Sequence, residues 1–593
     1  MARSAQNPLR LPIRNKALNR LATRLLGLGP LMDIYAAWRT SPAGGAPSGE
    51  RLLDHALKSL NAHLEWQRDA ALPDLPQQGP LIVVANHPLG GLDGMLLTRE
   101  LLKQRSDTMV LVNELLLRFP EFNDLFIGLD VLGAGSRLKN AAGIRAACRH
   151  LQSGGTLLVF PAGTVSGLSV RRLSIEDPAW NDFVGRLALR YRAACLPVRV
   201  NARNSLGFYL SALIHKRLRT ALLPRELANK RDAVVYAAAG ELVSAREIEQ
   251  LQNPADVTRS LRLASDLLAL RSHQYVDSDE DRQEAPIAGN VEIAWLDQRI
   301  AALQPYELVR DGMMSVYCAP YEALGCVMTQ IAIDRETTFR AVNEGTGREL
   351  DSDHFDPFYW HLWVWDHANS RIVGAYRIGK VDEIVNLHGI DCLYSSSLYK
   401  FGEVLLQNLA GTIEVGRSFV AIPYQRHPKA LDLLWRGIGE FVVQNPGYHT
   451  LFGCVSISRQ YSTQARAFLA DTMMKNFAVS LKWQQHVRAQ SPLRVSGKSW
   501  SAETLASLNS IAIINKLLGS LDRGKRIPIL LRHYLALNGR FAAFTVNRGF
   551  NDSLDGLIFV DLRLAPEKYL NRYLGVEGSR YFRQLWSENE KAA

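Results

Sequence analysis

Short apolar runs, each followed by a polar turn, recur through the first half of the chain. They span residues 81–85, 155–160 and 195–200, and the turns that follow cover 86–94, 161–166 and 201–205. Apolar runs of this kind are typical of strands buried on both faces of a parallel sheet. Because the carboxyl ends of parallel strands meet at one edge, the pattern predicts an α/β fold with the three turns side by side.

The second half of the chain shows longer strands with tight turns between them. Residues 360–366 and 371–377 are rich in aromatic and β-branched side chains and flank a turn at 368–370, which predicts a hairpin. A further strand is predicted over 411–422, then the basic loop Arg426-His427-Pro428 and a helix over 429–443. We therefore expect a mixed sheet rich in antiparallel pairs. A proline in a helix's first turn leaves free N–H groups, so this helix start, with Arg426, is predicted to bind a pantetheine phosphate.

Length and composition predict that the chain forms two domains. Its 593 residues exceed what one hydrophobic core usually serves, which favours two domains of about 250 to 300 residues. Residues 274–290 switch to an acidic, weakly hydrophobic composition typical of a linker. We expect an N-terminal membrane-associating region at 1–50, a first domain at 51–273, a linker at 274–292 and a second domain at 293–593.

The N-terminal region predicts contact with a membrane surface. Ile13, Leu18, Leu21 and Leu25 recur at helical spacing among basic residues, which is typical of an amphipathic helix on anionic lipid. A helix packed on its own domain fits the pattern equally well. No apolar run reaches the roughly 18 residues that cross a bilayer, and the N-terminus lacks a secretory signal pattern. We expect a cytoplasmic protein, peripheral on the inner face of the bacterial cytoplasmic membrane.

The net charge of +11 and the pI near 9.3 indicate an acidic partner. The basic residues are dispersed without a nucleic-acid motif, so an anionic membrane surface or an acidic carrier protein is expected rather than nucleic acid. The six cysteines form no Cys-x-x-Cys pair, which is typical of reduced thiols in the cytosol and argues against a disulfide or a structural zinc.

The turn at 86–94 carries candidate chemistry. A His that takes a proton from a hydroxyl makes the oxygen a nucleophile, and a carboxylate on the other ring nitrogen fixes the tautomer. His87 and Asp93 suit these two roles, and Gly90, Gly91 and Gly94 would let the chain fold back so that they meet. Taken alone, a His and an Asp six residues apart are more often ordinary loop residues.

Three blocks of the first half resemble the glycerolipid acyltransferase superfamily: an Asn-His-x5-Asp block at 86–93, a Gly/Arg block at 133–140 and a Phe-Pro-x-Gly-Thr-x-Ser block at 160–166. The His-to-Asp spacing is one residue longer than the commonest form, and Ala162 stands where many members carry Glu. Both features resemble the branch of this superfamily whose members are named haemolysins. That branch includes O-acyltransferases of aminolipid synthesis. The resemblance implies that His87 and Asp93 are catalytic. It implies the following substrate-binding residues: Asn86, Gly91, Arg137, Asn140, Pro161, Gly163, Ser166, Arg203 and Asn204.

The second half resembles another acyltransferase family. It carries, in this order, Phe339-Arg340, the aspartate-rich stretch 351–356, and Glu-x-x-Arg at 414 and 417. This order resembles the acyl-homoserine-lactone synthase type of GNAT N-acyltransferase. The resemblance to the aminolipid N-acyltransferases is closer still. The resemblance implies that Glu414 and Arg417 are catalytic. It implies the following substrate-binding residues, of which Asp353 and Arg377 would be acceptor-side or bracing groups: Arg340, Asp353, Asp356, Arg377 and Arg426. Alternatively, the aspartates cap a turn and Glu414 and Arg417 form a structural ion pair. The aspartates lack the pattern of a calcium loop, so no metal is expected.

Together the resemblances imply a bifunctional aminolipid synthase of the ornithine-lipid type. The second domain would transfer a 3-hydroxyacyl group from acyl carrier protein to an amino acid. The first domain would acylate the 3-hydroxyl of the resulting lyso-aminolipid. The donor would arrive on the phosphopantetheine of acyl carrier protein, without a further cofactor. Three alternatives remain: a lysophospholipid acyltransferase with a non-catalytic C-terminal domain, a lipid-binding scaffold and a pore-forming haemolysin. The amino acid stays open among ornithine, lysine, glutamine and glycine.

Overall fold

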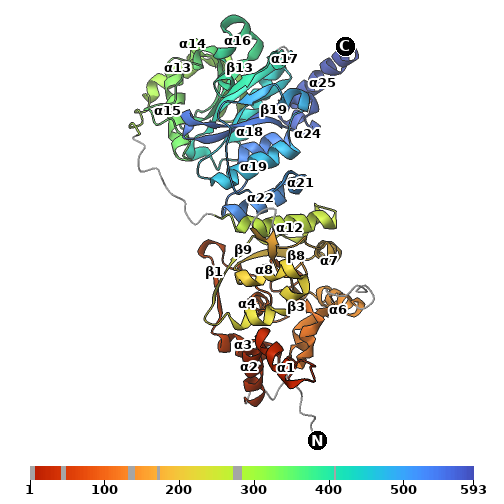
Figure 1. Ribbon diagram of the computed structural model, residues 1–593. Coiled ribbons are helices and arrows are strands. Elements are labelled where there is room, and N and C mark those ends of the chain that lie inside the picture. Colours follow the sequence, from red (N-terminus) through yellow and green to blue (C-terminus); the bar gives the residue numbers. More distant parts are fainter. Residues whose placement is uncertain are drawn as a thin grey trace. The chain divides into compact units, whose positions relative to one another are not determined.

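The three predicted apolar runs form neighbouring strands of one sheet in the computed structural model, which describes residues 7–41, 48–130, 140–169, 174–271, 284–406 and 409–592 (Figure 1). The strand order is β1-β9-β8-β2-β5-β3-β4. β2 (Leu81–Ala85) pairs in parallel with both β5 (Thr156–Val159) and β8 (Ala194–Asn201). All five side chains of β2 are buried, because both sheet faces are covered by other elements. The prediction that the three turns share one edge is confirmed.

The other strands of this sheet lie outside the central three. They are β1 (His63–Trp66), β3 (Thr108–Asn113), β4 (Phe126–Leu129) and β9 (Val234–Ala239), of which β9 pairs antiparallel with β8. β6 (Gly167–Ser169) and β7 (Ser174–Glu176) form a separate short antiparallel pair. The helices are α1 (Lys16–Leu25), α2 (Leu28–Thr40), α3 (Gly49–Leu60), α4 (Gly91–Leu102), α6 (Ala141–Gln152), α7 (Phe183–Tyr191), α8 (Leu206–Ile214), α9 (Lys216–Ala221), α10 (Leu223–Ala228), α11 (Ala245–Glu249) and α12 (Pro254–Leu268).

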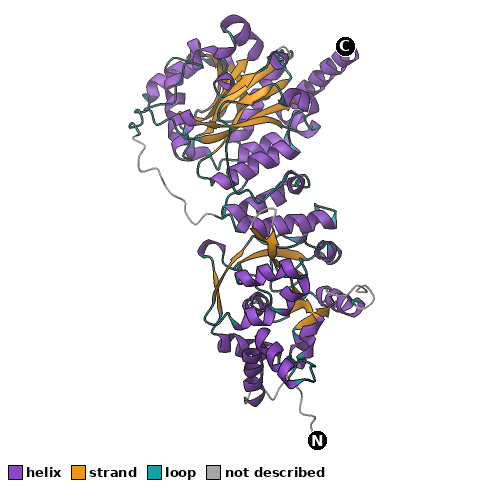
Figure 2. Cartoon of the chain, viewed as in Figure 1, coloured by secondary structure: helices purple, strands orange, loops and turns teal. Residues whose placement is uncertain are grey.

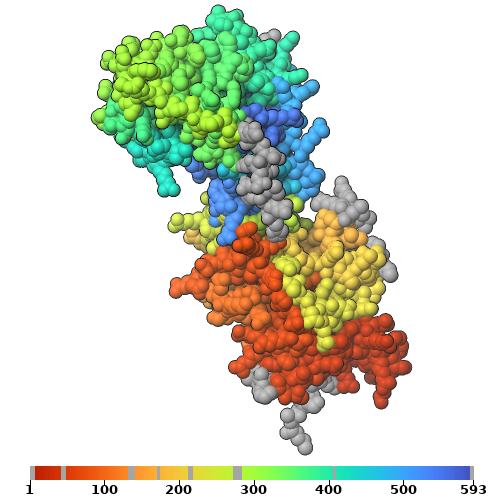
Figure 3. All heavy atoms as spheres, turned by 90° about the vertical axis from the view of Figure 1, so that its left-hand side faces the viewer, coloured from red at the N-terminus to blue at the C-terminus, as the bar shows by residue number. Residues whose placement is uncertain are grey.

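The N-terminal helix α1 leaves its apolar stripe exposed. Its N-cap Asn15 accepts hydrogen bonds from the backbone of Ala17 and Leu18, and no residue of the helix is buried. Leu18, Leu21 and Leu25 are 57%, 55% and 54% exposed. Figure 3 shows this red N-terminal segment on the outside of the first unit. The predicted amphipathic helix is present, and its leucines do not pack into the core of that unit.

The second sheet has the order β10-β11-β12-β13-β15-β16-β19-β18 (Figure 2). Among its described strands, only β15 and β16 pair in parallel, which confirms a mixed sheet rich in antiparallel pairs. The strands are β10 (Glu307–Asp311), β11 (Met314–Pro320), β12 (Trp360–Asp366), β13 (Arg371–Lys380), β15 (Thr412–Val420), β16 (Thr450–Ile457), β18 (Arg540–Asn547) and β19 (Ser553–Asp561), and β14 (Tyr399–Phe401) pairs with β17 (Val487–Ala489).

Helices flank this second sheet. They are α13 (Ile293–Ala302), α14 (Tyr321–Leu324), α15 (Cys326–Arg340), α16 (Val381–His388), α17 (Glu403–Leu406), α18 (Ala430–Gln444), α19 (Thr463–Asn476), α20 (Leu481–Gln484), α23 (Ile529–Ala536), α24 (Glu567–Tyr573) and α25 (Gly575–Ala592). No helix among the described residues is long and apolar enough to span a membrane.

The chain divides into two units at boundaries that differ from the predicted ones. The first unit is Met1–Arg271 with Ser499–Arg526, and the second is Ser272–Lys498 with Ile527–Ala593. The predicted second domain is therefore interrupted by a segment that belongs to the first unit. That segment holds α21 (Ala502–Leu505) and α22 (Ile511–Leu521). The C-terminal part of the predicted linker is also ordered, since Ala285 and Ala288 donate backbone hydrogen bonds to Gly347 and Glu349.

The α22 helix completes the hydrophobic core beside α12. Ile513 and Leu517 are 2% and 1% exposed, and they line a small internal cavity together with Leu251 and Leu261 of the first unit. At the segment's end, the Arg526 guanidinium binds the Glu241 carboxylate through two hydrogen bonds of 2.7 and 2.9 Å. Amphipathic spacing predicts that a helix like α22 is buried, but it does not identify the surface against which the helix packs.

Leu517→Ala is expected to destabilise the first unit, although residue 517 lies more than 200 positions after Arg271. Removing a buried leucine leaves a cavity and costs about 2–5 kcal/mol. Hydrogen exchange should therefore show faster exchange in α12 and β8, while the exposed substitution Asn509→Ala should have no such effect. If protection from hydrogen exchange falls only in residues 272–498, the assignment of residues 499–526 to the first unit is contradicted.

Candidate active sites

The first candidate site lies at the carboxyl ends of β2, β5 and β8. β2 ends at Ala85, and α4 begins at Gly91 after a sharp turn in which Gly90 has φ of +84°. A side chain there would also clash with Leu223, whose Cδ2 lies 2.9 Å from the position of a Cβ atom. A glycine is therefore required at residue 90. The turn brings Asp93, in the first turn of α4, back towards His87.

His87 and Asp93 form the predicted pair. His87 Nδ1 lies 3.0 Å from Asp93 Oδ1, and the Asp93 side chain is fully buried while that of His87 is 19% exposed. The Asp93 carboxylate also accepts 2.8 Å hydrogen bonds from the backbone N–H groups of Leu89 and Gly94. Burial alone would lower the pKa of His87, but the Asp93 carboxylate, its hydrogen bond and the charge of Asp177 raise it above its usual value. With Nδ1 held by Asp93, Nε2 remains for a substrate hydroxyl.

Asp177 joins the first two loops of this site, and no sequence motif singled it out. Its Oδ1 accepts hydrogen bonds from the Ser166 hydroxyl and, at 3.3 Å, from the His87 backbone N–H. Its Oδ2 accepts one from Trp180 Nε1 at 3.0 Å. Ser166 further donates its backbone N–H to the His87 carbonyl at 2.9 Å. The predicted binding residue Ser166 thus fixes the backbone around His87.

The predicted asparagines tie the third loop to the first. The Asn86 side chain donates to the Val200 carbonyl at 3.0 Å and accepts from the Val200 N–H at 2.6 Å. The Asn204 side chain donates to the Pro88 carbonyl at 3.1 Å. Both asparagines are 5% exposed, so their contacts brace the loops around His87.

The remaining predicted residues of the first site have varied surroundings. The Pro161 carbonyl accepts from the Asn181 N–H, and Gly163 has φ of +66° in the same loop. Gly91 is the first residue of α4. Asn140 exchanges hydrogen bonds with the Asp130 backbone before α6, and Arg203 is exposed. Arg137 lies outside the described residues.

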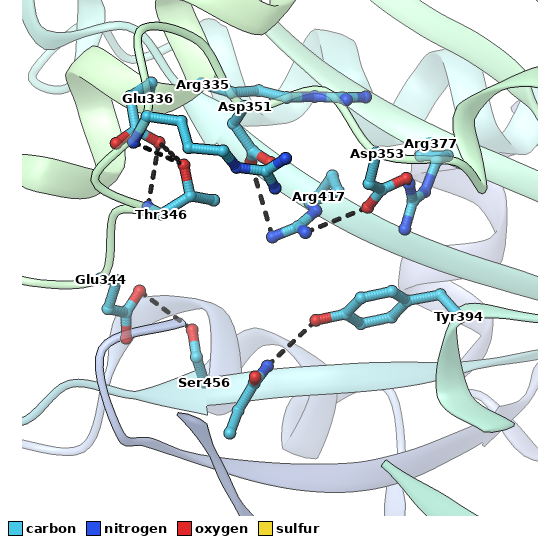
Figure 4. A network of polar contacts seen from close by, with 12 residues as sticks. Arg335, Glu336, Glu344, Thr346, Asp351, Asp353, Arg377, Tyr394, Arg417 and Ser456 are labelled. Carbon is cyan, nitrogen blue, oxygen red and sulfur yellow. Dashed lines mark hydrogen bonds and ion pairs between the residues drawn. The ribbon is translucent and has the colours of Figure 1, made fainter. Parts of the chain in front are cut away.

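The second candidate site is built around a buried cluster of three arginines and three aspartates beside the second sheet, and Figure 4 shows all of them except Asp356. Arg377 Nη1 donates to Asp353 at 2.6 Å and to Asp356 at 3.1 Å. Arg417 Nη2 donates to Asp353 at 3.1 Å, and its Nη1 lies 3.5 Å from Asp351. All five side chains are at most 10% exposed. Pairing of this kind is required because an isolated buried charge is very costly.

The third arginine, Arg335, is also paired, and the cluster shifts the pKa values of its neighbours. Arg335 donates to Asp356 at 3.0 Å and contacts His361 Nδ1 at 3.2 Å. Burial and the neighbouring guanidinium lower the pKa of His361 to about 3, so this ring stays neutral. Burial would raise the pKa of Asp356, but Arg335 and Arg377 hold it well below its usual range. Burial dominates at Asp351, whose pKa is raised.

Glu414 does not pair with Arg417, so the alternative of a structural ion pair between them is wrong. The Glu414 carboxylate accepts a hydrogen bond from the Tyr359 hydroxyl and another, at 2.8 Å, from the Ser395 N–H. Burial raises its pKa, and these hydrogen bonds oppose that shift. Glu414 therefore fixes the loop at 394–395, which places the Tyr394 ring 5.0 Å from the guanidinium carbon of Arg417.

β15, the strand that carries both Glu414 and Arg417, separates from β16 near this point. β15 pairs with β16 only over residues 412–414, opposite 450–452, although both strands continue. The pairing of β15 with β13 is irregular here as well, and Arg417 has φ of +47°. A Cβ atom on Gly416 would face open space. The Val415 carbonyl still lies against Gly453, but beyond it no described strand pairs with this edge of β15, and such an edge can bind an extended chain that carries amide groups.

Two predicted residues of this half lie elsewhere. The Arg340 guanidinium is fully engaged, with hydrogen bonds to the Glu336 carboxylate and the carbonyls of Ala285 and Arg348. It clamps the chain around 285 to the loop after α15. Arg426 is exposed before α18. α18 begins at Ala430 with Lys429 as N-cap, so Pro428 precedes the helix and the predicted proline in its first turn is wrong.

Sequence reasoning missed several residues of the second site: Arg335, Glu344, Tyr359, Tyr394, Asn547 and Asp555. Tyr394 follows a helix and a turn, and Asn547 and Asp555 lie more than 100 residues after Arg417, so no local spacing joins them to the motif. Among the described residues, no group of three or more His, Cys, Asp or Glu side chains could hold a metal ion.

Comparisons with known proteins found a match to a family model in each half of the chain. Residues 67–243 match an acyltransferase family model and residues 335–436 an acetyltransferase (GNAT) domain model. A glycine N(alpha)-acyltransferase of Phocaeicola vulgatus is 31% identical over 252 residues, which are 40% of this chain and 76% of that protein. A glycine N(alpha)-acyltransferase of Bacteroides thetaiotaomicron is 29% identical, over 40% of this chain and 74% of its own length.

A relative of a second kind matches as well. A lyso-glycine lipid O-acyltransferase of Phocaeicola vulgatus is 31% identical over 175 residues, which are 29% of this chain, and the chain spans 58% of that relative's length. A solved CoA-dependent acyl-homoserine lactone synthase overlaps 44% of this chain and 95% of its own, with 11% identity and a TM-score of 0.22. The two family models and the relatives of both kinds confirm the two resemblances found in the sequence, to an acyltransferase and to a GNAT N-acyltransferase.

His87→Ala is expected to lower O-acylation by about 10²–10⁴-fold, because the candidate base is removed. In the parent chain the rate should rise with pH through a pKa above 6.5, since only neutral His87 accepts a proton. Asp93→Asn should lower the rate and move this limb to lower pH, because burial then acts without the carboxylate. The exposed Asp182→Asn is the matched control. The assignment would be refuted if His87→Ala kept the parental rate, or if the rise of the rate with pH occurred at the same pH in Asp93→Asn as in the parent.

Proposed function

Because this chain belongs to the acyltransferase family that includes the bacterial glycine N(alpha)-acyltransferases, we propose that it makes an acylated aminolipid in two successive steps. The GNAT region would transfer a 3-hydroxyacyl group to the amine of an amino acid. The N-terminal acyltransferase region would esterify the new 3-hydroxyl with a second acyl chain. The observation that carries this proposal is the presence of both candidate sites in one chain, with relatives of both kinds.

For the O-acyl transfer, His87 Nε2 would take the proton of the 3-hydroxyl as its oxygen attacks the thioester carbonyl. The C–S bond breaks, and the imidazolium returns the proton to the departing thiolate. Asp93 stabilises the imidazolium during this step, because its carboxylate lies 3.0 Å from Nδ1. Asp177 and Ser166 act as positioning residues that hold the His87 backbone.

For the N-acyl transfer, the donor's pantetheine arm would lie along the open edge of β15. The arm carries two amide groups, and the β15 edge beyond Val415, with which no described strand pairs, offers donors and acceptors to them. We propose acyl carrier protein as the donor, with the acyl group on its phosphopantetheine and no further cofactor. The buried Arg417 and Arg377 would brace the site beside this edge rather than meet the donor's phosphate.

The lipid product would reside in a bilayer, so we also propose that the chain binds the inner face of the cytoplasmic membrane through α1. Its leucines are exposed, and Arg14, Lys16, Arg20 and Arg24 supply positive charge for anionic headgroups. This would bring His87 to a substrate that does not leave the membrane.

The two steps can be separated in the full chain, supplied with an amino acid and 3-hydroxyacyl and acyl thioesters of acyl carrier protein or coenzyme A. His87→Ala should accumulate the mono-acylated lyso-lipid. Arg417→Ala and Glu414→Ala should make none, yet should still acylate supplied lyso-lipid. Mixing His87→Ala with Arg417→Ala should restore the diacyl product, because the lyso-lipid passes between molecules.

A different outcome would support the main alternative. If the parent chain acylates lysophosphatidate but no amino acid, with ornithine, lysine, glutamine and glycine each tried, the lysophospholipid acyltransferase is the better account. Diacyl aminolipid made by His87→Ala alone would place the O-acyl step elsewhere.

Leu21→Glu should weaken binding to phosphatidylglycerol vesicles by about 10-fold, because a charge replaces a side chain that would enter the bilayer. Binding of the parent chain should also fall with rising salt. Leu387→Glu is the matched control, since Leu387 is 75% exposed on α16 of the second unit. Vesicle sedimentation measures all three chains. Equal binding of both variants would contradict membrane contact through α1.

A further inference from the structure

Glu344 is a buried carboxylate at the edge of the second site, and no cationic side chain in the described part of the chain pairs with it. It is 8% exposed, and within the described residues its side chain accepts one hydrogen bond, from the Ser456 hydroxyl at 3.0 Å. The neighbouring loop is held firmly, because the Ser458 hydroxyl donates to the Val342 carbonyl and the Asn551 side chain donates to that of Asn343. Glu344 is therefore fixed beside the end of β16.

A second buried carboxylate lies close by. Asp555 on β19 is 3% exposed and pairs across the sheet with Ser456, the hydrogen-bond donor of Glu344. Its oxygens accept hydrogen bonds of 2.8 Å from Asn547 and Ser553. Burial and the charge of Asp555 raise the pKa of Glu344 to about 8. Burial raises the pKa of Asp555, and Arg417 opposes that shift.

Glu344 lies across from the row of arginines and aspartates described above (Figure 4). Figure 4 shows Glu344 and Ser456 below the row formed by Asp351, Arg417 and Asp353, with Tyr394 and its hydrogen-bond partner on the same lower side. Arg417 lies on β15, and Ser456 and Asp555 belong to the β16 side, beyond the point where the two strands stop pairing. Arg417 Nε is buried there without a hydrogen-bond partner.

This arrangement suits a cationic acceptor. Two neighbouring buried carboxylates, of which Glu344 has no cationic partner among the described residues, are unfavourable, and a bound ammonium group would relieve that cost. The acceptor of an N-acyl transfer is such a cation at neutral pH, and it must lose a proton before its nitrogen can attack. A carboxylate that titrates near the working pH is an effective general base.

We propose that Glu344, with Asp555 beside it, receives the α-ammonium group of the amino acid acceptor and takes its proton. The inference rests on the N-acyl transfer proposed above and adds a residue that performs it. The freed amine nitrogen attacks the thioester carbonyl and forms the N–C bond, the C–S bond breaks, and the thiolate leaves. The second proton of the nitrogen goes to that thiolate, and the proton on Glu344 passes to water. Neither redox step nor co-reactant is required.

The test uses the full chain and compares Glu344→Gln with its parent, using the best amino acid among glycine, ornithine, lysine and glutamine. Glutamine keeps the shape and can still accept from Ser456, but it cannot take a proton. The turnover rate should fall by about 10²-fold or more at pH 7.5, and it should recover as rising pH supplies free amine. The KM for the thioester should not change. Glu344→Asp should retain part of the activity together with the pH dependence of the parent.

Two controls separate this role from a structural one. The exposed Glu403→Gln carries the same chemical change and should leave the rate unaltered. The thermal unfolding midpoint of Glu344→Gln should equal or exceed that of the parent, because a buried carboxylate without a counter-ion is removed. A parental rate in Glu344→Gln, or a loss that is the same at every pH, would overturn the inference. A parent chain that acylates no amino acid would instead refute the proposed function on which the inference rests.

Discussion

The buried ion pairs among Arg335, Arg377, Arg417 and their aspartates are the constraint on which the second unit depends. A guanidinium removed from water is tolerated only with a carboxylate beside it, so the loop at 351–356 must lie against β13 and β15. Arg377 and Arg417 also lie within about 5 Å of the Tyr394 ring, as measured from each guanidinium carbon to the ring centre. One cluster thus fixes two loops and the irregular stretch of β15 where the strands separate.

The first unit reaches its chemistry by a more local route. A strand, a glycine turn and the first turn of a helix bring His87 to Asp93 within seven residues. The carboxylate is held by backbone N–H groups of the same turn, so the pair forms wherever the turn forms. Longer contacts through Asp177 and Asn204 then hold the loops together. Because these contacts are local, a short motif is enough to specify the candidate pair.

This difference explains what the sequence predicted. The order of apolar runs predicted both sheets, and glycine spacing predicted the meeting of His87 and Asp93, because both depend on local chain geometry. Asp177, Glu344 and Asp555 were not predicted, since each reaches its site through pairing of distant strands or loops. Arg340 shows the opposite case. It matches a motif and was predicted to bind substrate, but its guanidinium binds the Glu336 carboxylate and the Ala285 carbonyl. The interruption of the second domain at 499–526 was not predicted, because the apolar spacing of a helix shows that it is buried but not which surface it packs against.

The central claim is that two acyl transfers in series act on one amino acid. It is tested most directly by lipid mass spectrometry of a bacterial host that makes no aminolipid and expresses the full chain. The account predicts a new lipid that contains one amino acid, a 3-hydroxyacyl amide and an ester-linked second acyl chain, together with a smaller pool of the lyso-lipid. A host whose phospholipid acyl chains change while no aminolipid appears would contradict the account.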